Sequence, residues 1–143
     1  MIPTQAIEEA AAHLSRGGLV AMPTETVYGL GADARQPLAV RRIFAAKGRP
    51  LGHPLIAHLP SIEWFERWGQ TNAMAMELAH RFWPGPLTLI VPKKSAVPDE
   101  VTGGLSTIGM RMHGNSRNKI AIRVLHYWIS SNQNAITMRL ISF

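Results

Sequence analysis

The residues best suited to bind an anionic ligand lie in one short basic loop. Lys47 and Arg49 stand two positions apart in the sequence Lys-Gly-Arg-Pro, directly after a predicted helix. An arginine can hold phosphate or carboxylate oxygens with two parallel hydrogen bonds, and a lysine acts as a point charge. Basic residues are also favoured at the C-terminus of any helix, so a solvated helix end is a second interpretation.

A second polar group follows an apolar run near the N-terminus. Thr24, Glu25 and Thr26 come directly after this run and precede Gly29 and Gly31. Hydroxyl groups at the end of a strand can hold a small polar ligand, and glycines let backbone N–H groups approach it. The alternative is a tight turn whose threonines bond to their own backbone. The spacing matches neither a Walker loop nor a dinucleotide-binding glycine motif.

Two histidines and one arginine complete the set of candidates. His53 and His58 bracket a second apolar run, and no further ligand stands at metal-binding spacing from them, so no metal site is predicted. His58 is either a functional residue or a core histidine with satisfied hydrogen bonds. Arg111 is the single charge in the run 107–112, so it must face solvent or a polar cleft that supplies a partner.

Composition indicates one folded domain, and the lack of cysteine fits a reducing compartment without proving one. The chain has 143 residues, no cysteine and a formal net charge of +6. No apolar run is long enough to cross a membrane and no signal peptide is evident, so a cytoplasmic protein is expected. All the acidic residues lie at or before Glu100, whereas residues 112–143 carry only basic charges. The positive balance is therefore weak evidence for an RNA-binding face.

The periodicity of apolar residues predicts an α/β protein. Helices are expected over 4–16, 38–46, 62–68 and from 71 or 72 to 82, and strands over 19–22, 55–59, 87–91 and 107–112. The run 87–91 is apolar apart from one threonine, which predicts a strand buried on both faces. Residues 92–104 are rich in turn formers and are expected to form a loop.

Helix boundaries and buried positions follow from the same pattern. Pro37 is expected in the first turn of the second helix, Ser61 is expected to cap the third helix, and Thr71 or Asn72 is expected to start the fourth. The buried side of the second helix is predicted to contain Leu38, Val40, Ile43 and Phe44. The core aromatics are predicted to be Trp64, Trp68, Phe82 and Trp83.

Four ordered motifs give the chain a family resemblance. From residue 17 to 111 it resembles the YrdC-like family of threonylcarbamoyl-adenylate synthases. The motifs are GGLVAMPTETVYGLGADA, the Lys47-x-Arg49 loop with GRPLGHPLIAHL, FWPGPLTLIV and VTGGLSTIGMRM. The resemblance implies a twisted open mixed sheet with flanking helices and a positively charged cavity.

The resemblance also implies a reaction and roles for the candidate residues. Threonine, bicarbonate and ATP would become threonylcarbamoyl-AMP and pyrophosphate. The threonylcarbamoyl-AMP would then be used, together with partner proteins of that pathway, for tRNA threonylcarbamoyladenosine modification. Threonine would bind near Thr26, His58 and Arg111. ATP would bind near Lys47, Arg49, His53 and Thr107, of which Lys47 and Arg49 would be catalytic, and Mg²⁺ would accompany the ATP.

The resemblance stops after Met112. The family continues with a Pro-Ser-Ala-Asn segment, of which residues 113–143 contain no counterpart. We therefore divide the chain into a YrdC-like domain, 1–112, that is incomplete at its C-terminal side, and a non-family tail, 113–143, that is frameshifted or poorly ordered. Impaired activity is expected from this departure. The alternative function is a non-catalytic module that binds tRNA or double-stranded RNA.

Overall fold

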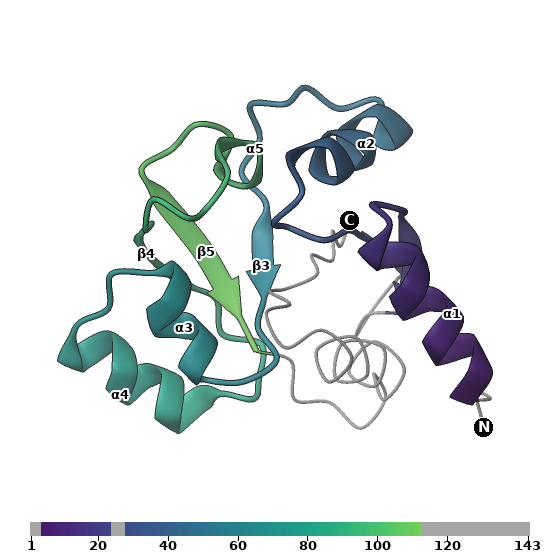
Figure 1. The fold of residues 1–143 in the computed structure, drawn as a ribbon. Coiled ribbons are helices and arrows are strands. Elements are labelled where there is room, and N and C mark those ends of the chain that lie inside the picture. Colours follow the sequence, from purple (N-terminus) through teal and green to yellow (C-terminus); the bar gives the residue numbers. More distant parts are fainter. Residues whose placement is uncertain (1–3, 24–27, 113–143) are drawn as a thin grey trace.

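The computed structural model describes residues 4–23 and 28–112 of the chain. These residues form ten helices and strands, coloured along the chain in Figure 1. In order they are α1 (Thr4–Ser15), β1 (Val20–Pro23), β2 (Tyr28–Gly31), α2 (Pro37–Lys47), β3 (Ile56–His58), α3 (Glu63–Trp68), α4 (Ala73–Phe82), β4 (Leu89–Pro92), α5 (Asp99–Thr102) and β5 (Thr107–Arg111). The expected mixture of helices and mixed strands is confirmed.

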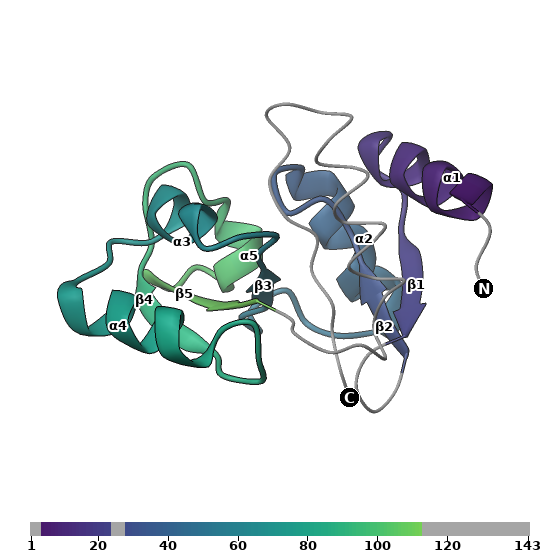
Figure 2. The ribbon, with the colours of Figure 1, turned by 90° about the horizontal axis from the view of Figure 1, so that it is seen from below.

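Two sheets divide the described strands. β1 and β2 pair antiparallel, with Val20 opposite Gly31. The second sheet has the order β3-β5-β4, in which β5 is parallel to β3 and antiparallel to β4. Figure 2 shows β1 and β2 beside α1 and α2, while the three-stranded sheet lies with α3, α4 and α5.

One face of the three-stranded sheet packs against α3. Trp64, Phe65 and Trp68 are all buried on this helix. A Cβ atom at Gly69, just after the helix, would lie 2.4 Å from Val91 Cγ2 and 2.7 Å from the Cε atom of Met110. The chain can therefore approach the sheet so closely only because position 69 lacks a side chain.

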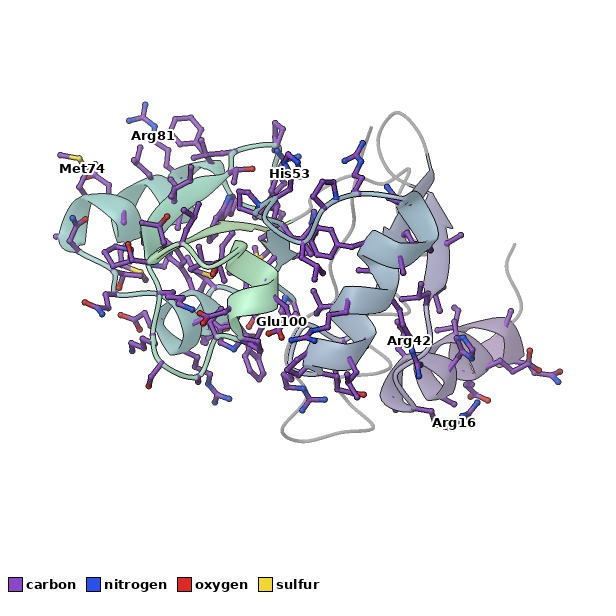
Figure 3. All side chains as sticks on the ribbon, turned by 90° about the horizontal axis from the view of Figure 1, so that it is seen from above. Arg16, Arg42, His53, Met74, Arg81 and Glu100 are labelled. Atoms are coloured by element: carbon purple, nitrogen blue, oxygen red, sulfur yellow. The ribbon has the colours of Figure 1, made fainter. Side chains whose placement is uncertain are left out.

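Two contacts join α2 and α5, which belong to different groups of elements. The Arg41 guanidinium donates from Nε and Nη2 to Glu100 Oε1, at 3.0 and 2.7 Å. Figure 3 shows Glu100 on α5 facing α2. Ile43 and Phe44 of α2 also belong to the same buried cluster as Val101 of α5. α2 and α5 thus contribute to one buried cluster, which also contains residues of α3 and of the three-stranded sheet.

Most predicted elements are present, and some details of helix ends and burial are wrong. Pro37 begins α2, and Asn72 caps α4 by accepting a 2.8 Å hydrogen bond from the N–H of Ala75. Ser61 does not cap α3; its hydroxyl bonds the carboxylate of Glu63 and lowers the pKa of that group. Leu38 is 71% exposed instead of buried, because Ala39 occupies the inward position that Leu38 was expected to fill.

Phe82 and Ile90 are also exposed, contrary to prediction. Phe82 lies at the end of α4 and is 48% exposed, whereas the three predicted core tryptophans are buried. Among the described strands β4 lies at an edge of its sheet, its burial alternates, and its Ile90 is 71% exposed. Only one face of β4 is packed against the core, so the prediction from the apolar run 87–91 of a strand buried on both faces is wrong.

Candidate functional site

Polar side chains gather on the face of the three-stranded sheet opposite α3. Along β5, Thr107, Gly109 and Arg111 share one face because successive side chains alternate. A Cβ atom at Gly109 would lie 3.5 Å from Thr88 Cγ2 and 3.9 Å from Ile56 Cγ1. Ile90 Cγ1 of β4 would also lie 3.9 Å away, so side chains from both neighbouring strands and from Thr88, just before β4, surround Gly109.

Arg111 and Thr88 are joined at the C-terminal end of β5. The Nε atom of Arg111 donates a 2.9 Å hydrogen bond to Oγ1 of Thr88. The backbone carbonyl of Arg111 accepts a 2.8 Å bond from the N–H of Leu59. Both side chains of the hydrogen-bonded pair are half-buried. Among the described residues, Thr88 is the hydrogen-bond partner that the structure shows for the Arg111 guanidinium. The two terminal NH₂ groups of Arg111 can therefore bind a carboxylate with two parallel hydrogen bonds.

His58 lies beside Arg111 on the neighbouring strand. It is opposite Arg111 in the parallel register of β3 and β5, which places both side chains on the same face. His58 is 5% exposed. The structure thus brings together two of the three residues predicted for threonine, His58 and Arg111, and adds Thr88 to them.

Lys47 and Arg49 stand on either side of a sharp reversal at the end of α2. Gly48 adopts the left-handed conformation, with φ +61°. Its N–H bonds the carbonyl of Ala45 at 3.2 Å, and the N–H of Arg49 bonds the carbonyl of Phe44 at 3.0 Å. This pair of bonds is a Schellman motif, which fixes the backbone that carries both cations. Lys47 is half-buried, and Arg49 is exposed.

The other two residues predicted for ATP lie near the start of the sheet. His53 is exposed on the α2–β3 loop, residues 48–55, as Figure 3 shows. The loop ends in a 2.8 Å hydrogen bond from the N–H of Leu55 to the carbonyl of Val101 on α5. Thr107 begins β5, and its distance along the strand from Arg111 is about 13 Å. Thr107 therefore lies at the opposite end of β5 from Arg111 and His58.

Thr26 and the two glycines near it were the remaining candidates close to the N-terminus. Thr26, like Thr24 and Glu25, lies outside the described residues, so its predicted contact with threonine stays a prediction. Gly29 and Gly31 do not form a turn that approaches a ligand, because both lie in β2 and pair with Met22 and Val20 of β1.

The residue that sequence reasoning missed here is Thr88. Arg111 was expected to face either solvent or a polar cleft with a partner, and Thr88 is the single hydroxyl in the apolar run 87–91. An antiparallel register between that run and 107–112 would have suggested the pair.

The described residues, 4–23 and 28–112, lack two features that would indicate other classes of site. They contain no group of three or more His, Cys, Asp or Glu residues that could hold a metal ion. Within the same ranges, no helix is long and apolar enough to span a membrane.

Comparisons with known proteins identify similar sequences. A family model for Sua5, YciO and YrdC proteins, described as telomere recombination, matches residues 12–130. A threonylcarbamoyl-AMP synthase of Pyrococcus abyssi is 50% identical over 120 residues, which are 83% of this chain and 34% of that protein. One of Bacillus subtilis is 50% identical over 108 residues, 74% of this chain and 31% of that protein. One of Idiomarina loihiensis is 34% identical over 132 residues, covering 88% and 70%.

Solved structures show the same likeness. P. abyssi Sua5 complexed with L-threonine superposes with a TM-score of 0.87 at 43% identity, covering 99% of this chain and 39% of that one. Escherichia coli YciO superposes with a TM-score of 0.81 at 24% identity, covering 100% and 66%, which supports the fold alone. The chain spans about a third of the length of the P. abyssi and B. subtilis relatives. The family match extends past residue 112, and the division of the chain there stays a prediction.

Proposed function

The chain belongs to the Sua5, YciO and YrdC family, and from that membership we propose that it forms threonylcarbamoyl-AMP. The substrates are threonine, bicarbonate and ATP. The threonine amine and bicarbonate combine with loss of water to give a carbamate. A carbamate oxygen then attacks the α-phosphorus of ATP, and pyrophosphate leaves. The product serves tRNA threonylcarbamoyladenosine modification.

The observation that best supports this proposal is the cluster at the C-terminal end of β5. Arg111 is held by Thr88 through Nε, and the rest of its guanidinium can take a carboxylate. His58 stands beside it on the same face. An amino acid bound here would extend along the sheet over Gly109, whose missing side chain leaves space between Thr88 and Ile56. Thr26 would complete this end of the site.

At the other end we assign the triphosphate to Lys47, Arg49, His53 and Thr107. Two cations on a rigid helix end can neutralise the charge that develops on the phosphate oxygens during the transfer. Mg²⁺ would accompany the ATP and bind mainly through its phosphates, as it does in many nucleotide sites. The carboxylate of threonine would lie at one end of β5 and the triphosphate towards the other, so that the carbamate and the α-phosphorus would meet between them.

Purified chain should release pyrophosphate from ATP only when threonine and bicarbonate are both present. Because residues 113–143 contain no Pro-Ser-Ala-Asn segment, we expect slower turnover than that of the P. abyssi synthase assayed in parallel. Threonine binding, measured by calorimetry, gives a second readout that needs no turnover. Pyrophosphate release at the same rate with and without threonine would contradict the proposal, and so would the absence of threonine binding.

Replacement of Arg111 by lysine tests the carboxylate contact directly. Lysine keeps the charge but loses the fork, so Arg111→Lys should weaken threonine binding by about tenfold to a hundredfold. Binding of ATP, measured without threonine, should stay within about twofold of the wild-type value, because the two ends lie about 13 Å apart. An equal loss of both affinities would place Arg111 outside the threonine end.

A further inference from the structure

Two consecutive glycines after α5 share a backbone conformation but differ in their surroundings. Gly103 has φ +62° and Gly104 has φ +83°, both in the region that disfavours side chains. A Cβ atom at Gly103 would lie 2.6 Å from the carbonyl oxygen of Gly52 and 2.8 Å from its carbonyl carbon. A Cβ atom at Gly104 would meet nothing within 4 Å. Only Gly103 therefore lies directly against the α2–β3 loop.

The helix before these glycines is firmly anchored. Val101 and Thr102 are buried, with 0% and 1% of their surface exposed. Glu100 is tied to α2 through Arg41, and Asp99 forms an ion pair with Lys93 next to β4. If a side chain appeared at position 103, α5 could not move away without breaking these contacts and disturbing the core.

The loop that faces Gly103 lies at the surface of the molecule. Its residues from Gly48 to Pro54 are all exposed, and a Cβ atom at Gly52 would meet nothing within 4 Å. Its far end is held by the hydrogen bond from Leu55 to Val101. A collision at Gly52 would therefore be relieved by movement of the loop rather than of α5. The same loop carries Arg49 and His53.

We propose that Gly103 is a positioning residue for the ATP end of the site. Its bare α-carbon lets the Gly52–His53 backbone lie against the end of α5, a few residues before Thr107 begins β5. This contact sets where Arg49 and His53 stand relative to Thr107. The ATP role rests on the proposed function, whereas the positioning of the loop rests on the packing alone.

The matched pair Gly103→Ala and Gly104→Ala separates loop contact from backbone strain. Each variant puts one methyl group on a residue with positive φ, so both carry a similar conformational cost. Hydrogen exchange of the Arg49 and Leu55 amides reports the loop, since both are hydrogen-bonded in the structure. We expect Gly103→Ala to speed exchange at Leu55 by about tenfold or more, and Gly104→Ala to leave it near the wild-type rate. Equal exchange in the two variants would overturn the proposal.

The functional arm measures KM for each substrate in the same pair. We expect Gly103→Ala to raise KM for ATP by about tenfold and to change KM for threonine by less than about twofold. Gly104→Ala should change neither value. A parallel rise in both KM values would overturn the ATP-specific role. If the wild-type chain makes no threonylcarbamoyl-AMP, the proposed function fails, while the exchange experiment still decides whether Gly103 positions the loop.

A second pair protects the test against a folding failure. Asparagine enters the left-handed region at lower cost than alanine, yet its Cβ atom would meet Gly52 in the same way. Gly103→Asn and Gly104→Asn should therefore both fold, as judged by circular dichroism. The same difference in Leu55 exchange is expected between them, and its absence would count against the proposal as directly as in the alanine pair.

Discussion

Thr88 gives Arg111 its orientation through one hydrogen bond between side chains. The hydroxyl oxygen accepts from Nε, and the methyl group of the same threonine faces Gly109. A bond to a charged donor is worth about 1.5–3 kcal/mol, so its loss should be measurable in substrate binding. Arg111 without this partner would sample other rotamers and present its fork less often.

The pair Thr88→Val and Thr88→Ser tests this role at the threonine end. Valine keeps the shape but removes the acceptor, so threonine binding should weaken by about tenfold. Serine keeps the hydroxyl and should retain most of the affinity. Titration calorimetry with threonine measures both. If serine lost as much affinity as valine, the methyl group and not the hydrogen bond would be the important contact.

At the scale of elements, the salt bridge between α2 and α5 should make stability depend on pH. The hydrogen bonds from Arg41 lower the pKa of Glu100 below its usual value. A carboxyl group with a lowered pKa stabilises the folded state at pH values above its unfolded pKa, and this contribution disappears as pH falls through the folded pKa.

Comparison of wild type with Glu100→Gln should follow that sign. Above about pH 5 the wild type should be more stable, by less than about 1 kcal/mol because Arg41 is largely exposed. The difference should shrink towards zero in more acidic solution. Urea unfolding at several pH values measures it, and Arg41→Gln and the double variant complete a mutant cycle. A difference that grew on acidification would show that another group is responsible.

The elements that could be predicted from the sequence are those with strong local signals. α4 has its Asn72 cap and an amphipathic repeat, and β5 has alternating burial. β2 was missed because two of its four residues are glycines, which are unfavourable in strands, so its pairing with β1 decides its structure. α5 has only four residues, which is too short for any helical period to show. Thr88 was missed because it becomes Arg111's partner only through strand register.

At the scale of the whole molecule, one core connects two groups of elements. Ala39, Val40, Ile43 and Phe44 come from α2, whereas Trp64, Phe65 and Trp68 come from α3, and all belong to the same buried cluster. A shared core predicts that the described part of the chain unfolds in one cooperative transition. It also means that a destabilising substitution in α2 should shift the unfolding of the aromatic residues packed on the three-stranded sheet.

The tryptophans make that coupling measurable. Trp64, Trp68 and Trp83 are all buried beside the three-stranded sheet, and none lies in α2. Trp128 lies outside the described residues, so a Trp128→Phe background restricts the fluorescence signal to those three. Unfolding in urea can then be followed by fluorescence for the sheet and by circular dichroism for the helices.

Ile43→Ala and Leu38→Ala form a matched pair on the same helix. Ile43 is fully buried, so its truncation should lower the free energy of unfolding by about 2–5 kcal/mol and shift the tryptophan transition accordingly. Leu38 is 71% exposed, and its truncation should change stability by less than about 0.5 kcal/mol. If Ile43→Ala shifted the unfolding transition seen by circular dichroism but not the one seen by tryptophan fluorescence, the two groups of elements would unfold separately. The loop with Lys47 and Arg49 would then sit on one folding unit and Arg111 on another, and the two ends of the site would not hold a fixed separation.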